Sequence, residues 1–498
     1  MSREASHLLD RAATGIAGMD EILGGGFPRN RMYLVEGDPG AGKTTLALQF
    51  LLEGARRGEA GVYVTLSETE EELRDVARSH GWTLDGITIC DLQTSEESLQ
   101  ADSQYTLFHP SEIELSETTR SVLEVVEKVN PTRVVFDSLS EMRLLARDSL
   151  RYRRQVLSLK QYFTQRNCTV LLLDYDASTS GDFQLQSLTH GVIALEQLAP
   201  EYGGQRRRLR IKKVRGVRFH DGFHDFRIET GGLVIYPRLV AAGHQRSFQR
   251  ETLASGLPEL DQLLGGGVDR GTSLMLLGPS GVGKTVITSQ YVTAAAARGE
   301  PSAIFLFDES PDTWRIRAEG LGLDVGQHLE SGTISLRQID PAEMAPGEFA
   351  QAVRQAVDTG CRIVVIDSLN GYRHAMPEER FLTLHLHELL SHLNQQGVVT
   401  FMVLAQHGLV GSDLESAIEL TYLSDNIIVV RYFEAFGSVR QAISVVKKRT
   451  GNHERSVREL RLGPGIQVGN QLREFQGILS GQNLIFNDRE QLLGDGHG

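Results

Sequence analysis

Cysteine is scarce in this sequence of 498 residues: only Cys90, Cys168 and Cys361 occur, widely separated and without a CxxC pair. Neither a zinc site nor a disulfide framework is supported by such spacing, and a reducing compartment fits it. The first residues, M-S-R-E-A-S-H, lack the apolar core of a signal peptide, and no apolar run is long enough to span a membrane. We therefore expect a cytoplasmic protein with no membrane partner.

Basic residues are also in deficit, with 51 Lys and Arg against 64 Asp and Glu and a net charge of -13. This balance argues against a protein whose main task is to coat nucleic acid. The sequence also lacks low-complexity blocks, and its 40% hydrophobic content is typical of globular proteins. Nucleic acid is therefore not an expected partner.

What the sequence does contain is a long internal repeat. The stretch G-D-P-G-A-G-K-T at Gly37–Thr44 recurs as G-P-S-G-V-G-K-T at Gly278–Thr285, at a constant offset that also holds for the flanking residues. We predict two domains, residues 1–245 and 246–498, the second with a short C-terminal tail. In each copy, near-continuous apolar strands alternate with helices, which indicates a mainly parallel sheet covered on both faces. The predicted fold class is α/β, with tandem P-loop NTPase domains.

The glycine-rich loops join an apolar strand to a helix, which is the context that makes this motif specific for nucleotide phosphates. We expect Lys43 and Lys284 to contact the β- and γ-phosphates of ATP, and the hydroxyls of Thr44 and Thr285 to bind Mg²⁺. Asp137 and Asp367 end matched apolar strands, where an acidic residue completes the Mg²⁺ shell. The predicted loop contacts to ATP are Gly37, Asp38, Pro39, Gly40, Ala41, Gly42, Lys43, Thr44 and Thr45, and Gly278, Pro279, Ser280, Gly281, Val282, Gly283, Lys284 and Thr285.

Hydrolysis also needs a carboxylate that orients or deprotonates the attacking water. No glutamate directly follows Asp137 or Asp367, so the candidates come from the end of another strand: Glu68 in the first copy, and Asp308 with Glu309 in the second. Helix capping is the alternative role for these residues. The recurrence at one offset favours catalysis, with Glu68 the weaker candidate because its neighbour, Ser67, is not an acid.

Two basic strands recur as well, with Lys213 and Arg215 matched by Lys447 and Arg449. A Lys-x-Arg pair in an extended strand places both cations on one face. That face could act on the γ-phosphate of a neighbouring subunit, as an arginine finger does. Spacing alone equally allows a solvated edge strand or contacts with nucleic-acid phosphates.

Together these motifs resemble the KaiC family, the double-domain RecA-like ATPases of the bacterial circadian clock. The resemblance covers nearly the whole chain: the segments before both P-loops, the P-loops, T-L-S-E-T and F-D-E-S, both D-S-L segments, both K-x-R strands and F-Q-G-I-L-S-G. It implies a homohexameric double ring with ATP between subunits, so that Lys213, Arg215, Lys447 and Arg449 reach the neighbour's nucleotide. It also implies hydrolysis by paired strand-end glutamates in ring one and phosphoryl transfer in ring two. Because Ser67 replaces the first of those acids, ring one is expected to hydrolyse weakly or through Glu68 alone.

The resemblance further implies autophosphorylation on a Ser-Thr pair in the second ring. Ungapped alignment places Thr421 and Tyr422 on that pair, with Ser424 as a second-choice acceptor and Gln186-Ser187 at the unmodified position of ring one. An ordinary β-strand threonine is the alternative for Thr421. The tail is too short to imply the activator KaiA, whereas a KaiB-like protein or a histidine kinase is a candidate partner.

The leading hypothesis is a hexameric ATPase and Ser/Thr autokinase that acts as a timing or stress-signalling switch. The rival on the same fold is a nucleic-acid-dependent ATPase, for which no zinc module, oligonucleotide-binding domain or basic-aromatic loop is present. A third reading is a scaffold whose ring is cemented by ATP with little catalysis.

Overall fold

The computed structural model describes residues 10–92, 110–146, 148–175, 184–199, 203–240, 247–340, 342–374, 382–406, 421–479 and 484–485. The chain divides into two compact units, Met1–Arg238 and Leu239–Gly498, called unit one and unit two below. The domain boundary predicted between residues 245 and 246 lies outside the described residues.

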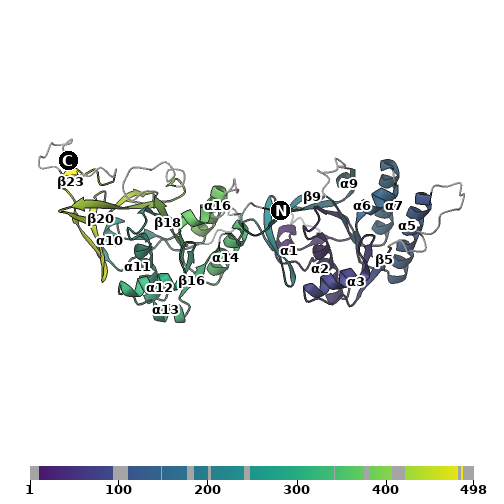
Figure 1. Cartoon of the computed structure of the whole chain (residues 1–498), viewed down its shortest axis with the longest axis horizontal. Helices are drawn as coiled ribbons and strands as arrows, with labels where there is room; N and C mark the ends of the chain where they lie inside the picture. Colours follow the sequence, from purple (N-terminus) through teal and green to yellow (C-terminus); the bar gives the residue numbers. More distant parts are fainter. Residues whose placement is uncertain are drawn as a thin grey trace, which may run out of the picture. The chain divides into compact units, whose positions relative to one another are not determined.

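Unit one contains the following elements in chain order (Figure 1): β1 (Arg11–Ala12), α1 (Met19–Leu23), β2 (Phe27–Pro28), β3 (Met32–Gly37), α2 (Lys43–Arg56), β4 (Gly61–Thr65), α3 (Glu70–Ser79), β5 (Ile87–Asp91), α5 (Pro110–Val129), β6 (Arg133–Asp137), α6 (Leu139–Ala146), α7 (Ser149–Gln165), β7 (Thr169–Asp174), α9 (Gln184–Leu188), β8 (Gly191–Leu198), β9 (Arg206–Val214), β10 (Phe223–Glu229) and β11 (Gly232–Tyr236).

Unit two repeats this order with few changes: β12 (Thr252–Leu253), α10 (Pro258–Leu263), β13 (Val268–Asp269), β14 (Ser273–Pro279), α11 (Lys284–Ala297), β15 (Ser302–Leu306), α12 (Pro311–Gly320), α13 (Gly326–Glu330), β16 (Ile334–Gln338), α14 (Pro346–Asp358), β17 (Ile363–Asp367), α15 (Leu369–His374), α16 (Leu382–Gln395), β18 (Val399–Gln406), β19 (Asn426–Ala435), β20 (Ser438–Lys448), β21 (Arg458–Gly463), β22 (Gly465–Gln471), β23 (Phe475–Gln476) and β24 (Leu484–Ile485).

Each unit is built on a nine-stranded sheet, with the order β11-β10-β9-β8-β3-β7-β6-β4-β5 in unit one and β22-β21-β20-β19-β14-β18-β17-β15-β16 in unit two. The strands from β8 to β5, and from β19 to β16, are parallel, and the remaining three in each sheet run antiparallel. The predicted α/β fold with two mainly parallel sheets is confirmed, and the duplication is visible strand by strand.

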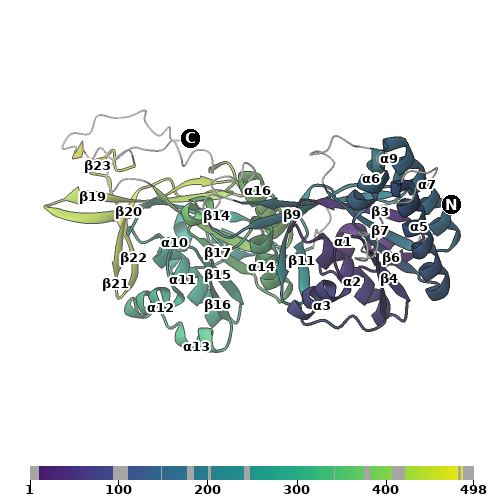
Figure 2. The same ribbon diagram turned by 45° about the vertical axis from the view of Figure 1, so that its right-hand side comes forward.

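Helices cover both faces of each sheet (Figure 2), because the buried parallel strands carry apolar side chains on both sides. In unit one, Tyr33 of β3 packs with α2 and α3, while Met32 packs with α5, α6 and α7. In unit two, Leu274 of β14 packs with α11 and α12, while Met275 packs with α14 and α16. Among the described helices, none is both long and apolar enough to cross a bilayer.

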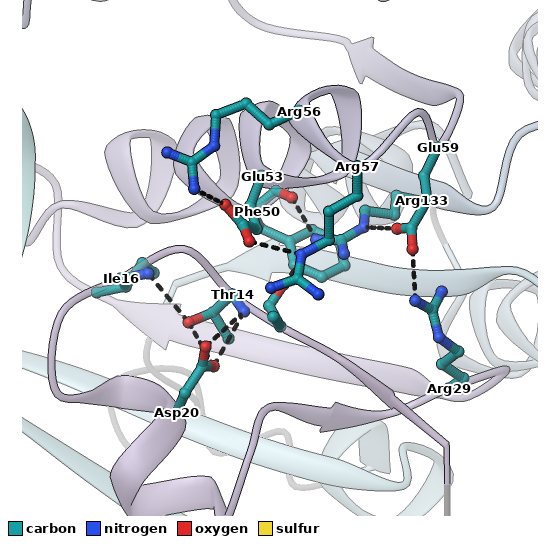
Figure 3. A network of polar contacts seen from close by, with 11 residues as sticks. Thr14, Ile16, Asp20, Arg29, Phe50, Glu53, Arg56, Arg57, Glu59 and Arg133 are labelled. Carbon is teal, nitrogen blue, oxygen red and sulfur yellow. Dashed lines mark hydrogen bonds and ion pairs between the residues drawn. The ribbon is translucent and has the colours of Figure 1, made fainter.

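The glycine-ended segments that precede the P-loops are held by a partly buried aspartate. Asp20 accepts hydrogen bonds from the Thr14 amide and hydroxyl at 2.9 and 2.8 Å, as Figure 3 shows. Asp261 accepts the Ser255 amide at 2.8 Å at the matched place in unit two. The matched aspartates of these segments thus have a structural role, since they close the loop that leads into the central strand.

A buried guanidinium then ties the unit-one segment to the helix after its P-loop. Arg133 of β6 is fully buried and donates to the carbonyls of Ala13 and Phe50 at 2.8 and 2.7 Å (Figure 3). Glu59 neutralises it from 2.5 Å. A buried charge needs such a partner. The network therefore ties α2, through Phe50, to the segment that contains Ala13. The matched position in unit two is Ile363, so only unit one uses the device.

Candidate active sites

Each P-loop lies at the carboxyl end of the central strand and leads directly into a helix. β3 and β14 end in the loop, and α2 and α11 begin at Lys43 and Lys284. Gly42 and Gly283 precede those lysines with φ of 100° and 104°, a conformation that favours glycine. A Cβ on Gly42 would also lie 2.8 Å from Ile228 Cδ1. This backbone turns the amides of the helix start toward the loop, as phosphate binding requires.

The two loop lysines take the same position in both units. Lys43 Nζ donates to the carbonyls of Gly37 and Asp38 at 2.6 and 3.0 Å, and Lys284 Nζ donates to those of Gly278 and Pro279 at 2.8 and 2.6 Å. Burial lowers the pKa of Lys43, and lowers the pKa of Lys284 to about 8. Ala41 and Val282 are apolar and fully buried, so these predicted contact residues can offer a ligand only their backbone amides.

A hydroxyl and a carboxylate meet beside each loop. Thr44 Oγ1 donates to Asp137 Oδ2 at 3.2 Å, and Thr285 Oγ1 donates to Asp367 Oδ2 at 2.6 Å. Burial raises the pKa of Asp137, and raises the pKa of Asp367 to about 6. The peptide bonds from these aspartates to the following serines are cis in both units. Hydroxyl and carboxylate oxygens are the donors that Mg²⁺ prefers, so the residues predicted for it fit that ion.

In unit one, Glu68 stands next to this pair. Its carboxyl oxygen Oε2 is buried and accepts no hydrogen bond from the described residues. Burial raises its pKa, and the negative charge of Asp137 raises it further. Helix capping is not its role, because Thr69 caps α3 by accepting a hydrogen bond from the Glu72 amide. A half-buried carboxylate with a raised pKa near a phosphate loop suits general-base chemistry.

The matched carboxylates of unit two have partners. Glu309 forms a bidentate ion pair with Arg317 of α12, with both N···O distances at 2.6 Å. Asp308 is exposed and accepts a short hydrogen bond from Ser368, the residue after Asp367. Here too a different residue, Ser310, caps the helix. Sequence reasoning missed Arg317, although a basic residue two helical turns after a strand-end acid was a usable signal.

Lys213 and Lys447 lie on interior strands, and Arg215 and Arg449 directly follow the ends of those strands. β9 lies between β8 and β10, and β20 lies between β19 and β21, so the solvated edge-strand alternative is wrong. In unit two, Lys447 Nζ donates to the carbonyls of Thr421 and Ser424 at 2.9 and 2.6 Å, and Arg449 donates to that of Tyr422 at 2.9 Å. The structure therefore brings the predicted cations and the predicted phosphoacceptors together.

Unit one has the same arrangement with other side chains. Lys213 donates to the Gln186 carbonyl, and Arg215 donates to the Ser187 carbonyl at 2.7 Å. The side chain of Gln186 donates to Glu36, which is fully buried, at 3.0 and 3.1 Å. Lys212 pairs with the same carboxylate. Sequence reasoning missed Glu36, although a charge inside an apolar strand directly before a P-loop marks it.

The acceptor candidates of unit two differ in access. Tyr422 is 55% exposed, Thr421 is partly buried and Ser424 is fully buried. β19 begins at Asn426, so Thr421 precedes the strand and is not an ordinary strand threonine. Ser424 is thereby the least suited of these hydroxyls to receive a phosphoryl group.

The phosphate loop and the cation cluster of one unit lie at opposite ends of its sheet. β19 runs parallel to β14, with Asn426 opposite Leu274, and the Asp425 amide donates to the Ser273 carbonyl. The P-loop begins at Gly278, at the other end of β14. At about 3.3 Å per residue, roughly 16 Å of strand separates the two places. A unit's own Lys447 and Thr421 therefore cannot reach the nucleotide of its own loop.

Comparison with known proteins extends over both units. A family model described as KaiC ATPase matches residues 12–240 and again residues 253–472. The circadian clock protein KaiC3 of Synechocystis sp. is 27% identical over an alignment of 492 residues, which covers 95% of this chain and 94% of that protein. The circadian clock oscillator protein KaiC of Thermosynechococcus vestitus is 25% identical over 490 residues, 96% of this chain and 93% of that protein. KaiC of Synechococcus elongatus is 25% identical over 483 residues, 94% and 91% of the two chains.

Proposed function

This chain belongs to the KaiC family of ATPases, and from that premise we propose that it works as a homohexameric ATPase and Ser/Thr autokinase. In this proposal it is a cytoplasmic timing or stress-signalling switch, and the timing role is supported by the names of its relatives, which are circadian clock proteins. A KaiB-like protein or a histidine kinase is the proposed partner class. The coarser activity, ATP hydrolysis by a P-loop site, follows from the family.

One observation carries the oligomeric part of the proposal. The cations Lys447 and Arg449 hold the backbone of Thr421 and Tyr422 at the end of the sheet opposite the P-loop. Groups that cannot meet the nucleotide of their own unit can meet one supplied by another copy. A closed ring built by one repeated heterologous contact gives every copy such a neighbour. The cations would then stabilise the γ-phosphate charge of that neighbour.

The geometry supports a proposed role for each site residue. Lys43 and Lys284, with the loop amides, hold the phosphates, and Thr44 with Asp137 or Thr285 with Asp367 would hold Mg²⁺. The ion supplies charge neutralisation between the β- and γ-phosphates when bound. Glu68 in unit one, and either Asp308 or Glu309 in unit two, are the proposed groups that orient water or an acceptor hydroxyl.

Thr421 is the proposed acceptor in unit two. Its carbonyl is fixed by Lys447, which places the residue beside the cations that would face the neighbour's γ-phosphate. Its hydroxyl is short enough to be held in line for attack, whereas the ring of Tyr422 places that oxygen farther from the backbone. Unit one has Gln186 at this position, which offers no hydroxyl.

Incubation of the purified protein with ATP labelled in the γ-phosphate tests the proposal. Label on the protein supports the autokinase, released phosphate alone supports an ATPase, and neither supports a scaffold. Thr421→Ala should lose the label while phosphate release continues, and Thr421→Ser should keep it. Tyr422→Phe is the matched control. Unchanged labelling of Thr421→Ala would show that Thr421 is not the acceptor.

A further inference from the structure

Among the described residues, Arg317 is the one cation that forms a bidentate ion pair with a candidate catalytic carboxylate. Its two terminal nitrogens donate to the two oxygens of Glu309, each at 2.6 Å. The glutamate side chain is 18% exposed and the arginine 34%, so the pair is partly shielded from water. Fork-to-fork pairs of this kind are among the stronger and more directional polar contacts in proteins.

The pair belongs to the nucleotide site and not to a remote surface. The charges of both Glu309 and Arg317 act on Asp367, the carboxylate that meets Thr285. Arg317 sits on α12, whose start is fixed by the Ser310 cap, and Trp314 of the same helix is buried in the core. The helix therefore holds the guanidinium over the strand end in a defined place.

Unit one offers a natural comparison at the same position. α3 and α12 are matched residue for residue, with Leu73 of α3 buried at the place of Trp314. The counterpart of Arg317 is Val76, which packs against the apolar core. Glu68 consequently has no cation at the place where Glu309 has Arg317, and its Oε2 accepts no hydrogen bond among the described residues.

We propose that Arg317 is a positioning residue that keeps Glu309 out of the reaction and leaves Asp308 as the working carboxylate of unit two. This rests on the proposed function and names a means of regulating its second site. A base must accept a hydrogen bond from the attacking water or hydroxyl, and the guanidinium occupies one acceptor position on each oxygen of Glu309 and fixes the direction in which the carboxylate faces. Asp308 is exposed and is held by Ser368 beside Asp367. Unit two would thus turn over slowly because its second acid is tied down.

The test measures phosphate release by the full chain in a Glu68→Gln background, which removes the proposed unit-one base and keeps both P-loops. Arg317→Met should raise kcat by about three- to tenfold, a small part of what a general base contributes, with KM unchanged. Arg317→Lys, which keeps one charge, should give a smaller rise. The rise should vanish in Arg317→Met combined with Glu309→Gln. Arg315→Met, on the exposed side of the same helix, is the matched control and should change nothing.

The reverse substitution in unit one is a second test, whose outcome does not depend on how Arg317→Met affects the folding of unit two. Val76→Arg, placed in a Lys284→Ala background, should lower hydrolysis by unit one, because it sets a cation opposite Glu68. An unchanged or reduced kcat for Arg317→Met, or a gain that survives loss of Glu309, overturns the inference. If the unsubstituted protein neither binds nor hydrolyses ATP, the proposed function itself fails, which is a distinct result.

Discussion

Unit one has a buried carboxylate, Glu36, directly before its P-loop, whereas unit two has Leu277 at the matched position. In unit one this acid holds Gln186 and Lys212. In unit two Leu277 belongs to the apolar core, and the position of Gln186 is taken by Thr421. The same position of the fold therefore has two roles. In unit one Gln186 makes a structural hydrogen bond to Glu36, and in unit two Thr421 offers a hydroxyl beside the cations.

The two units also differ in the number and the partners of their strand-end acids. Unit two has two of them, but Glu309 is paired with Arg317, whereas the single Glu68 of unit one has a raised pKa and a buried oxygen without a hydrogen bond among the described residues. The number of strand-end acids in the sequence would favour unit two as the site of hydrolysis. The surroundings of each acid instead favour unit one as that site. A carboxylate's usefulness as a base depends on its partners as much as on its presence.

Removal of one phosphate-binding lysine at a time should separate the two units most strongly. Lys284→Ala should reduce protein labelling from γ-labelled ATP by at least about a hundredfold, because it takes a cation from the phosphates of the ATP that would modify Thr421 of the neighbouring copy. Lys43→Ala should leave labelling on those rings that still assemble. Size-exclusion chromatography with label counting makes the measurement. Equal loss of label in both variants would show that the units do not divide the work.

A second test isolates hydrolysis in unit one. Glu68→Gln, measured by phosphate release in a Lys284→Ala background, should lower the rate by about a hundredfold, since the charge-neutral amide cannot take a proton from water. Glu70→Gln is the control, because Glu70 is an exposed acid of α3 whose partner is Arg74. A rate that survives Glu68→Gln would assign the base elsewhere and make the two sites more alike than proposed.

Some features of the two sites could be predicted from the sequence, and others could not. Both P-loops, Asp137 and Asp367 lie in contiguous motifs that fix their own backbone, so their places in the fold follow from local pattern. The partner of Glu309 could not be predicted in this way, because it depends on a helix that folds back over the strand end. The edge-strand alternative failed for a similar reason. It left out β10, β11, β21 and β22, which extend each sheet beyond the basic strands.

A third prediction concerns the buried ion pair of unit one. Glu36→Leu should lower the free energy of unfolding of unit one by about 2 kcal/mol, since Lys212 and Gln186 lose the acid that holds them. Adding Lys212→Val gives unit one the residues that unit two has, Leu277 and Val446, and should recover part of the loss. Denaturant unfolding followed by circular dichroism measures both. A double variant no better than the single one would show that the carboxylate's bond to Gln186 matters more than its bond to lysine.

ATP binding by unit two should depend moderately on pH. Burial lowers the pKa of Lys284 to about 8, so the free protein loses this charge as pH rises through that value. Burial raises the pKa of Asp367 to about 6, so the carboxylate that Mg²⁺ needs is protonated as pH falls through that value. Affinity for Mg-ATP should therefore peak between these two values and fall on either side by at most about tenfold per pH unit, the limit for one linked proton. Titration of the Lys43→Ala protein with a fluorescent ATP analogue measures the profile, and Asp367→Asn should lose the acidic limb while keeping the basic one. A flat profile would mean that the neighbouring subunit, and not the buried environment within unit two, sets these charges.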